Sequence, residues 1–255
     1  MKLRIGRISY LNTEPFFMSD GIRADSVAAP PRQTLEMALA GEIDIAPLPV
    51  VAHFDHPGRF RILGPMGIAC DGPARTVIFR STVEIAALPR GARIGIINET
   101  ATSVRLLRVL LAHHYKVPHH LHFEDLDHGQ PGQLVIGDRA LASLSPTPAY
   151  PHVLDLGQAW KEMTGHPFVF ALWLARADLA VAATDTVVDY FRRSLTANRA
   201  DARAIHERRP DLRMTPEAIA DYIANFEFEL SAASLAGLEE FRALDTSLGR
   251  RGNAA

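Results

Sequence analysis

The stretch RIGIINETATSVRLLRVLLAHHY, residues 93–115, decides the fold class of this chain. Residues 93–97 are an apolar run that predicts a strand, and residues 98–101 are polar and predict a loop. A helix is predicted over residues 102–115 because apolar side chains recur there at helical spacing, namely Val104, Leu107, Leu110 and Leu111. A strand that leads through a short loop into a helix is the building unit of α/β proteins.

The same alternation continues outward from this stretch. Strands are predicted over 2–9, 43–48, 76–79, 134–136 and 168–174, and helices over 33–40, 184–208, from 215 onward and over 231–248. The run at 168–174 is continuously apolar, as in a strand buried on both faces. No long linker separates these elements, so any two domains must be joined by crossing strands. Together they predict an α/β fold.

Composition and charge exclude several classes of protein. The 255 residues include 27 Lys and Arg against 29 Asp and Glu, a formal net charge of −2. This balance gives no global attraction to nucleic acid or to an anionic membrane, so neither partner is expected. Cys70 is the one cysteine, which excludes an intrachain disulfide. The opening MKLRIGRISYLN lacks the apolar core of a signal peptide, and we expect a cytoplasmic globular protein.

Polar side chains gather in turns between a predicted strand and the following helix. The turns are Tyr10-Leu11-Asn12-Thr13, Thr100-Ala101-Thr102-Ser103 and Gly137-Asp138. In open α/β sheets ligands bind beyond the carboxyl ends of strands, so these turns are candidate ligand sites. Thr102 and Ser103 also begin a helix, where free N–H groups favour a carboxylate or phosphate. The alternative is that both residues, like Asp138, are ordinary helix caps, and that Asn12 only makes a turn.

Other reactive side chains have ordinary interpretations. A cluster of histidines lies around a predicted helix end, namely His113, His114, His119, His120 and His122. No cysteine pair or carboxylate set accompanies them, so we favour a solvated helix end and predict no metal. Cys70 has no obvious base and is not expected to act as a nucleophile. Neither a glycine-rich phosphate loop nor a dinucleotide fingerprint occurs, and no cofactor is predicted.

Several longer motifs are spread along the chain. They are RIGRISYLNTEP at 4–15, GEIDIA at 41–46, GPARTV at 72–77, TSVRLLR at 102–108, LVIGD at 134–138, and DLG, WK and TGHPFVFALW between 155 and 173. Together these motifs, which span roughly residues 4–176, resemble the MqnA family, the chorismate dehydratases of the futalosine route to menaquinone.

The resemblance implies a fold like that of the type II periplasmic binding proteins, with a ligand cleft between two α/β lobes. We expect lobe one to comprise residues 1–81 and 177–255, and lobe two residues 82–176. The resemblance also implies the reaction, in which chorismate loses water and becomes 3-[(1-carboxyvinyl)oxy]benzoate. Chorismate is a small dicarboxylate, and the ring becomes aromatic when water leaves, which drives the reaction.

Roles for individual residues follow from their positions in the motifs. The resemblance implies a catalytic role for the Asn12 amide. It implies substrate contacts for Tyr10, Leu11, Thr13, Thr76, Thr102, Ser103, Gly137 and Asp138. Apart from Glu14 and Asp138, these motifs offer only neutral polar groups and no obvious general base. We therefore hypothesise that a carboxylate of the substrate takes the proton itself.

The chain departs from the family pattern at two places in the expected cleft. Residues 98–101 replace a serine-rich turn that carries an arginine, and Val50 replaces a serine. Both departures affect substrate contacts more than the fold. Two other functions stay open: a cytosolic protein of the same fold that binds or senses a small carboxylate without chemistry, and the sister pathway enzyme MqnD. The sequence leaves monomer and dimer equally open.

Overall fold

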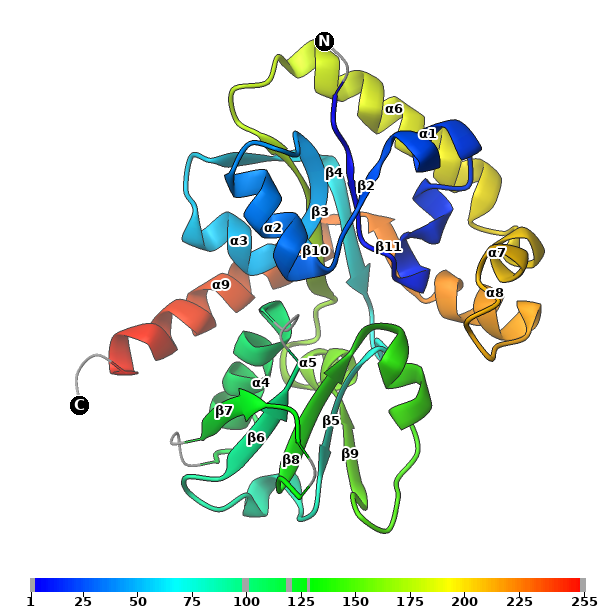
Figure 1. Cartoon of the computed structure of the whole chain (residues 1–255). Helices are drawn as coiled ribbons and strands as arrows, with labels where there is room; N and C mark the ends of the chain where they lie inside the picture. The colour runs from blue at the N-terminus through cyan, green and yellow to red at the C-terminus, as the bar shows by residue number, and fades with distance from the viewer. Residues whose placement is uncertain (1–2, 98–100, 118–120, 128, 253–255) are drawn as a thin grey trace. The chain divides into compact units, whose positions relative to one another are not determined.

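The structure is a computed structural model that describes residues 3–97, 101–117, 121–127 and 129–252. The chain forms two compact units (Figure 1). Unit 1 consists of Met1–Ala69 and Phe170–Ser231, and unit 2 consists of Cys70–Val169 and Ala232–Ala255. The division falls inside two strands, β4 (Phe60–Cys70) and β10 (Phe168–Arg176), and just before the helix α9 (Ala232–Gly252).

Unit 1 is built on a four-stranded sheet with the strand order β11-β4-β10-β3. Its outer strands are β3 (Ile45–Pro49) and β11 (Phe226–Glu229). A second small sheet pairs β1 (Gly6–Arg7) with β2 (Val27–Ala28) in parallel. The surrounding helices are η1 (Leu11–Phe16), α1 (Asp20–Asp25), α2 (Pro31–Leu39), α3 (Val50–Asp55), α6 (Val181–Asn198), α7 (Ala202–Arg208) and α8 (Pro216–Ala224). Helix α2 packs on β3, and α6 packs on η1.

The core of unit 1 is an aromatic cluster that includes the last residue of η1. The ring of Phe16 lies 5.1 Å from Trp173, 5.2 Å from Phe191 and 5.3 Å from Phe228, measured between centroids. All four side chains are fully buried. Edge-to-face and tilted contacts at these separations add to the stabilisation that burial of aromatic surface provides. The core therefore anchors the turn that carries Asn12 from its C-terminal side.

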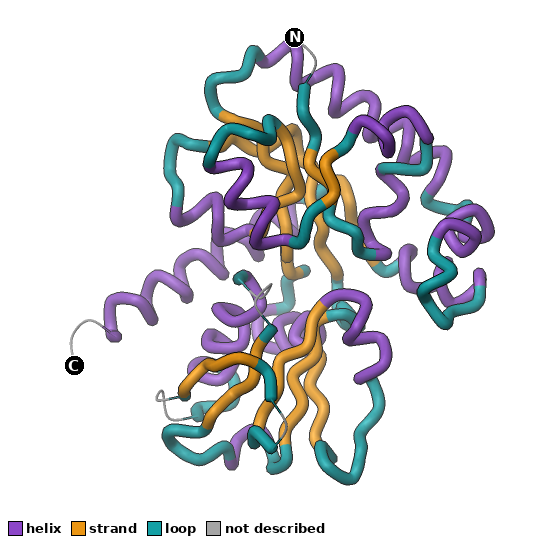
Figure 2. The backbone as a smooth tube through the Cα atoms, in the orientation of Figure 1, coloured by secondary structure: helices purple, strands orange, loops and turns teal. Residues whose placement is uncertain are grey.

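Unit 2 is built on a five-stranded sheet with the strand order β7-β6-β8-β5-β9. Figure 2 shows its strands in orange and the helices beside them in purple. The strands are β5 (Val77–Ser81), β6 (Arg93–Ile96), β7 (His122–Asp125), β8 (Gly132–Ile136) and β9 (His152–Asp155). The helices are η2 (Ile85–Ala87), α4 (Thr102–His113), η3 (Gly137–Ser143), α5 (Leu156–Thr164) and α9. Strand β6 runs parallel to β8, and β5 runs antiparallel to it. The ends of β6 and β8 and the start of β5 therefore meet at one edge of the sheet.

The two units differ from the expected lobes at both boundaries. Strand β5 pairs with β8 and β9, so residues 70–81 belong to unit 2, although lobe one was expected to extend to residue 81. Helix α9 also belongs to unit 2, although the chain from residue 177 to its end was expected in lobe one.

The physical reason for the place of α9 is its packing on unit 2. It packs against α4, where Arg105 Nη1 donates to Asp245 Oδ2 at 2.9 Å. The Phe241 ring of α9 also lies 5.9 Å from the ring of Trp160 in α5.

The predicted α/β class is confirmed, and the predicted helices at 33–40 and 102–115 correspond to α2 and α4. The single helix predicted over 184–208 is wrong, because α6 ends at Asn198 and α7 begins at Ala202. Asp201 separates them: its side chain accepts from the Ala204 N–H at 3.1 Å and caps α7. No helix in the described part of the chain is long and apolar enough to cross a membrane.

Candidate functional site

The Asn12 turn lies in unit 1, between β1 and the helix η1. Tyr10 is extended and precedes η1. The buried Thr13 hydroxyl shares its proton between the Ile8 carbonyl at 2.5 Å and the Tyr10 carbonyl at 2.8 Å. A hydroxyl has one proton to donate, so the two carbonyls share it. Because both carbonyls precede Thr13 in the chain, this contact holds the turn closed and keeps Asn12 in place. Leu11 is fully buried and belongs to the interior of the protein.

Thr76, Gly137 and Asp138 lie together at the shared strand edge of unit 2. The Gly137 N–H donates to the Thr76 carbonyl at 2.9 Å, which joins the start of β5 to the end of β8. Gly137 has a φ of 67°, a left-handed conformation that glycine adopts without steric cost. The half-buried Asp138 follows in the first turn of η3. These three predicted site residues are therefore neighbours in the structure.

Thr102 and Ser103 are the first two residues of α4, which follows β6 at the same edge. Both are buried, each with 5% of its surface exposed. The residue before them, Ala101, makes no side-chain cap, and the first turn contains no acidic residue. The early N–H groups of a helix have no partners within the helix, so they attract an anion. The helix start thus offers N–H donors and hydroxyls to a carboxylate.

Two of these predicted residues carry a buried polar atom with no hydrogen-bond partner in the described part of the chain. One is the amide oxygen of Asn12, in unit 1, and the other is the hydroxyl oxygen of Thr102, in unit 2. Native proteins satisfy most buried polar atoms. Leaving one unpaired costs about 1–3 kcal/mol. A group retained at this cost fits a ligand that supplies the missing hydrogen bond.

Asp155 is a residue of this edge to which the sequence analysis assigned no role. Its carboxylate accepts from the N–H groups of Ala74 at 2.9 Å and Arg75 at 2.6 Å, directly before Thr76. It also accepts from Gly157 and Gln158 and so caps α5. Burial raises the pKa of Asp155, and these four N–H groups oppose that rise.

The segment that Asp155 holds has an unusual backbone. Arg75 has a φ of 61°, which is uncommon for a residue with a side chain. Asp155 therefore fixes a strained segment that positions Thr76. An Asp ahead of a helix is a readable capping signal. Its contact with residues 74 and 75, by contrast, is a tertiary one.

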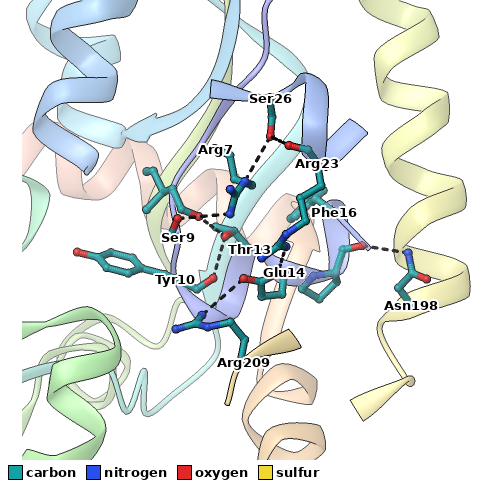
Figure 3. A network of polar contacts seen from close by, with 12 residues as sticks. Arg7, Ser9, Tyr10, Thr13, Glu14, Phe16, Arg23, Ser26, Asn198 and Arg209 are labelled. Carbon is teal, nitrogen blue, oxygen red and sulfur yellow. Dashed lines mark hydrogen bonds and ion pairs between the residues drawn. The ribbon is translucent and has the colours of Figure 1, made fainter. Parts of the chain in front are cut away.

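Glu14, one of the two carboxylates expected as a possible base, is committed to ion pairs. It is 2% exposed. Arg23 Nη1 lies 2.5 Å from Glu14 Oε2, and Arg209 Nη1 lies 3.6 Å from Glu14 Oε1 (Figure 3). Asp138 is therefore the remaining side-chain candidate for a base among the motifs.

The two departures from the family pattern have different outcomes. Val50 is fully buried at the start of α3. Residues 98–100, and His119 and His120 of the histidine cluster, lie outside the described residues.

Comparison with known proteins relates the chain to a curated enzyme. It is 29% identical over 259 residues to a protein of Thermus thermophilus named chorismate dehydratase, and the match covers 93% of each chain.

Solved structures show the fold. Protein AF1704 of Archaeoglobus fulgidus superimposes with a TM-score of 0.77 at 16% identity, covering 97% of both chains. The periplasmic aliphatic sulphonate-binding protein SsuA of Escherichia coli superimposes with a TM-score of 0.63 at 15% identity, covering 98% of this chain and 92% of that one. The expected periplasmic-binding-protein-like fold is thereby confirmed.

The family assignment rests on a match along nearly the whole chain. The profile of the family described as Menaquinone biosynthesis matches residues 3–245. This match confirms the family resemblance that the sequence motifs indicated, and the chain belongs to the menaquinone biosynthesis family.

Proposed function

We propose that this protein is a chorismate dehydratase that converts chorismate to 3-[(1-carboxyvinyl)oxy]benzoate and water. The observation that carries the proposal is a pair of buried atoms, Asn12 Oδ1 and Thr102 Oγ1, that have no hydrogen-bond partner among the described residues. Both residues belong to motifs shared with this enzyme family, and both are suited to a ligand with a hydroxyl and carboxylates. The relative named chorismate dehydratase supports the same substrate.

The reaction is an elimination that balances without a co-reactant. One ring C–H bond and the C–O bond of the ring hydroxyl break, the proton and the hydroxyl are lost as water, and the ring becomes aromatic. The step is redox-neutral, so we propose no cofactor. Because aromatisation supplies the driving force, the protein has to orient the substrate and support the leaving hydroxyl.

Within this proposal the predicted site residues have separate tasks. The α4 start, with Thr102 and Ser103, binds a carboxylate through N–H groups and hydroxyls. The Asn12 amide hydrogen-bonds the ring hydroxyl, since an amide both donates and accepts. Thr76, Gly137 and Asp138 contact the ring and the second carboxylate from unit 2, and Tyr10 does so from unit 1. Thr13 holds the turn.

The proton acceptor in the proposal is a carboxylate of the substrate. Glu14 supports this choice because its carboxylate is buried and paired with two arginines of unit 1. The alternative base is Asp138. In the Asp138→Asn variant, turnover should persist at a reduced rate if the substrate acts as its own base. Abolished turnover with intact chorismate binding would assign the base to Asp138.

A direct assay tests the proposed function. Purified protein is incubated with chorismate, and the product is followed by mass spectrometry and ultraviolet absorbance. Loss of one water with formation of an aromatic product is expected. Binding without turnover would instead favour a carboxylate sensor. Failure to bind chorismate would favour MqnD, whose substrate is a later intermediate. The proposal retains a cytoplasmic location, which the description of the family as a biosynthetic one supports.

A further inference from the structure

We propose that Arg209 is a positioning residue for Asn12, acting through the buried carboxylate of Glu14. This inference rests on the proposed function, because it assumes that Asn12 is the catalytic amide. The observations that carry it lie entirely within unit 1 and concern how the short helix η1 is held.

Glu14 is the polar residue through which η1 is held from outside. It lies two residues after Asn12 in the same six-residue 3-10 helix, and its carbonyl accepts the Phe17 N–H at 2.8 Å. Its side chain is 2% exposed and is paired with Arg23 and Arg209 (Figure 3). A buried carboxylate needs such partners, because loss of hydration makes an isolated buried charge costly. The position of Glu14 therefore depends on where these guanidinium groups are held.

The two arginines differ in what they can fix. Arg23 belongs to α1, which directly follows η1, so its contact is local and moves with the segment that it holds. Arg209 follows α7, far along the chain, and is itself 7% exposed. Its Nε and Nη2 donate to Asp211 at 2.8 and 2.6 Å, which leaves Nη1 facing Glu14. Arg209 thus ties the Asn12 turn to the C-terminal helices of unit 1.

A second long-range contact holds η1 beyond Glu14. Ser194 Oγ and Asn198 Nδ2, both from α6, donate to the Pro15 carbonyl at 2.9 and 3.3 Å. Together with burial of Phe16 in the aromatic core, these bonds secure the C-terminal end of η1. The end of η1 that carries Asn12 is held by the local hydrogen bonds of Thr13 and by the two ion pairs of Glu14. Loss of Arg209 should therefore loosen the Asn12 end while the rest of η1 stays anchored.

The guanidinium groups near Glu14 interact with it, and with one another, through their charge. Arg7 also lies in this group, donating to Ser26 and Ser9, and its pKa is lowered by burial and then by Arg23 and Arg209. Three guanidinium groups thus gather around one buried carboxylate (Figure 3). Replacing Glu14 would leave these like charges together, so variants of Arg209 give the cleaner test.

The experiment compares Arg209→Met with Arg209→Lys and with the control Asp211→Asn. Asp211 contacts the same guanidinium, but its side chain is 60% exposed, and asparagine keeps an oxygen that accepts from Arg209. Arg209→Met should lower kcat for chorismate at least 10-fold with KM changed less than threefold. Arg209→Lys, which keeps a charge for Glu14, should restore kcat to within threefold. Asp211→Asn should leave kcat within twofold.

A double variant separates positioning from general stability. If Arg209 acts through Asn12, adding Arg209→Met to Asn12→Ala should lower kcat by less than a further twofold. Multiplied losses in the double variant, or a lowered melting temperature with unchanged kcat in Arg209→Met, would overturn the proposal. Should Arg209→Met fail to fold, the pair Glu14→Gln with Arg209→Met removes the isolated charge and is expected to show the same loss of kcat.

Hydrogen exchange gives a readout that needs no substrate. Peptides that cover residues 8–17 should exchange faster in Arg209→Met than in the wild-type protein or in Asp211→Asn. Unchanged exchange of these peptides would overturn the positioning role of Arg209, even if chorismate is the substrate. Faster exchange in Arg209→Met, together with a wild-type protein that does not convert chorismate, would instead support the hold of Arg209 on this turn and refute the proposed dehydratase activity.

Discussion

At the residue scale, two predicted site residues each keep a buried polar atom without a hydrogen-bond partner. Asn12 Oδ1 and Thr102 Oγ1 are both of this kind within the described residues. Each was a candidate from its motif alone, because strand-to-helix turns carry ligand groups in α/β proteins. That they lack internal partners, however, is a property of the folded protein, and no local pattern distinguishes Thr102 from an ordinary helix-capping threonine.

Asn12→Ala should lower turnover much more than substrate binding. If the amide supports the leaving hydroxyl mainly in the transition state, kcat for chorismate should fall about 100-fold, roughly 2.7 kcal/mol, with little change in KM. Steady-state kinetics on protein with wild-type circular dichroism checks this. Unchanged kcat would remove Asn12 from the mechanism.

Thr102→Val should separate binding from stability. Valine keeps the shape of threonine and removes an unpaired buried hydroxyl, so thermal stability should stay the same or rise slightly. The KM for chorismate should rise about 10-fold, since one bond to a charged carboxylate is lost. The matched control is Thr34→Val in α2. The Thr34 hydroxyl is fully buried and hydrogen-bonds the Ala29 and Pro30 carbonyls, so this variant should lose stability and keep its KM. Equal effects of the two variants would contradict the assignment.

At the element scale, local signals predicted about half of the helices and strands and missed others. Apolar spacing located α2 and α4, and Thr215-Pro216 correctly marked the start of α8, where Thr215 accepts the Ala218 N–H at 3.2 Å. The break between α6 and α7 was missed because the apolar pattern continues across it. Strand β4 was missed as well, since Gly64, Pro65 and Gly67 interrupt the alternation that indicates a strand.

Gly157→Ala tests how α5 positions the segment before Thr76. A Cβ at Gly157 would lie 2.6 Å from the Gly72 carbonyl oxygen and 3.0 Å from the Ala74 nitrogen. The backbone must shift to relieve this overlap, so we expect a loss of about 2 kcal/mol in stability and weaker chorismate binding. Gly249→Ala in α9 is the control, because a Cβ there meets nothing within 4 Å. That variant should be neutral or slightly stabilising, as alanine is the better helix former. Thermal melts of both variants decide, and equal melting temperatures would refute the close approach.

At the scale of the whole molecule, distant segments converge on single charged groups. Asp44, at the entrance to β3, accepts from Arg4 Nη2 at 2.8 Å and from Arg176 Nη1 at 3.0 Å. Its side chain is 1% exposed, so this carboxylate joins the segment before β1, the start of β3 and the end of β10 within unit 1. The side-chain hydrogen bond from Arg4 is the largest cause of a lowered Asp44 pKa, and burial opposes it.

Asp44→Asn should change the dependence of stability on pH. Since the folded pKa lies below the unfolded one, ionised Asp44 stabilises the fold above about pH 4. That stabilisation is lost as the pH falls through the folded pKa. The variant should be about 2 kcal/mol less stable than the wild type at pH 7, and the difference should shrink below pH 4. Urea unfolding between pH 3 and 8 measures it.

The exposed Asp178 is the control for this prediction. It pairs with the same Arg176, but its side chain is 69% exposed. Exposed ion pairs contribute little, so Asp178→Asn should lower stability much less than Asp44→Asn does. A difference for Asp44→Asn that stays constant from pH 7 to pH 3 would show that the Asp44 charge is not the stabilising feature.

The sequence by itself determined the α/β class, the family, and the turns that hold Asn12, Thr76, Thr102 and Gly137. These features depend on local spacing and on short motifs, which a linear chain displays directly. Only the tertiary structure decided that β5 and α9 belong to unit 2, that Asp155 holds the segment before Thr76, and that Arg209 reaches Glu14. Each of these joins residues far apart in the chain, and such pairings arise from packing and charge burial after the elements have formed.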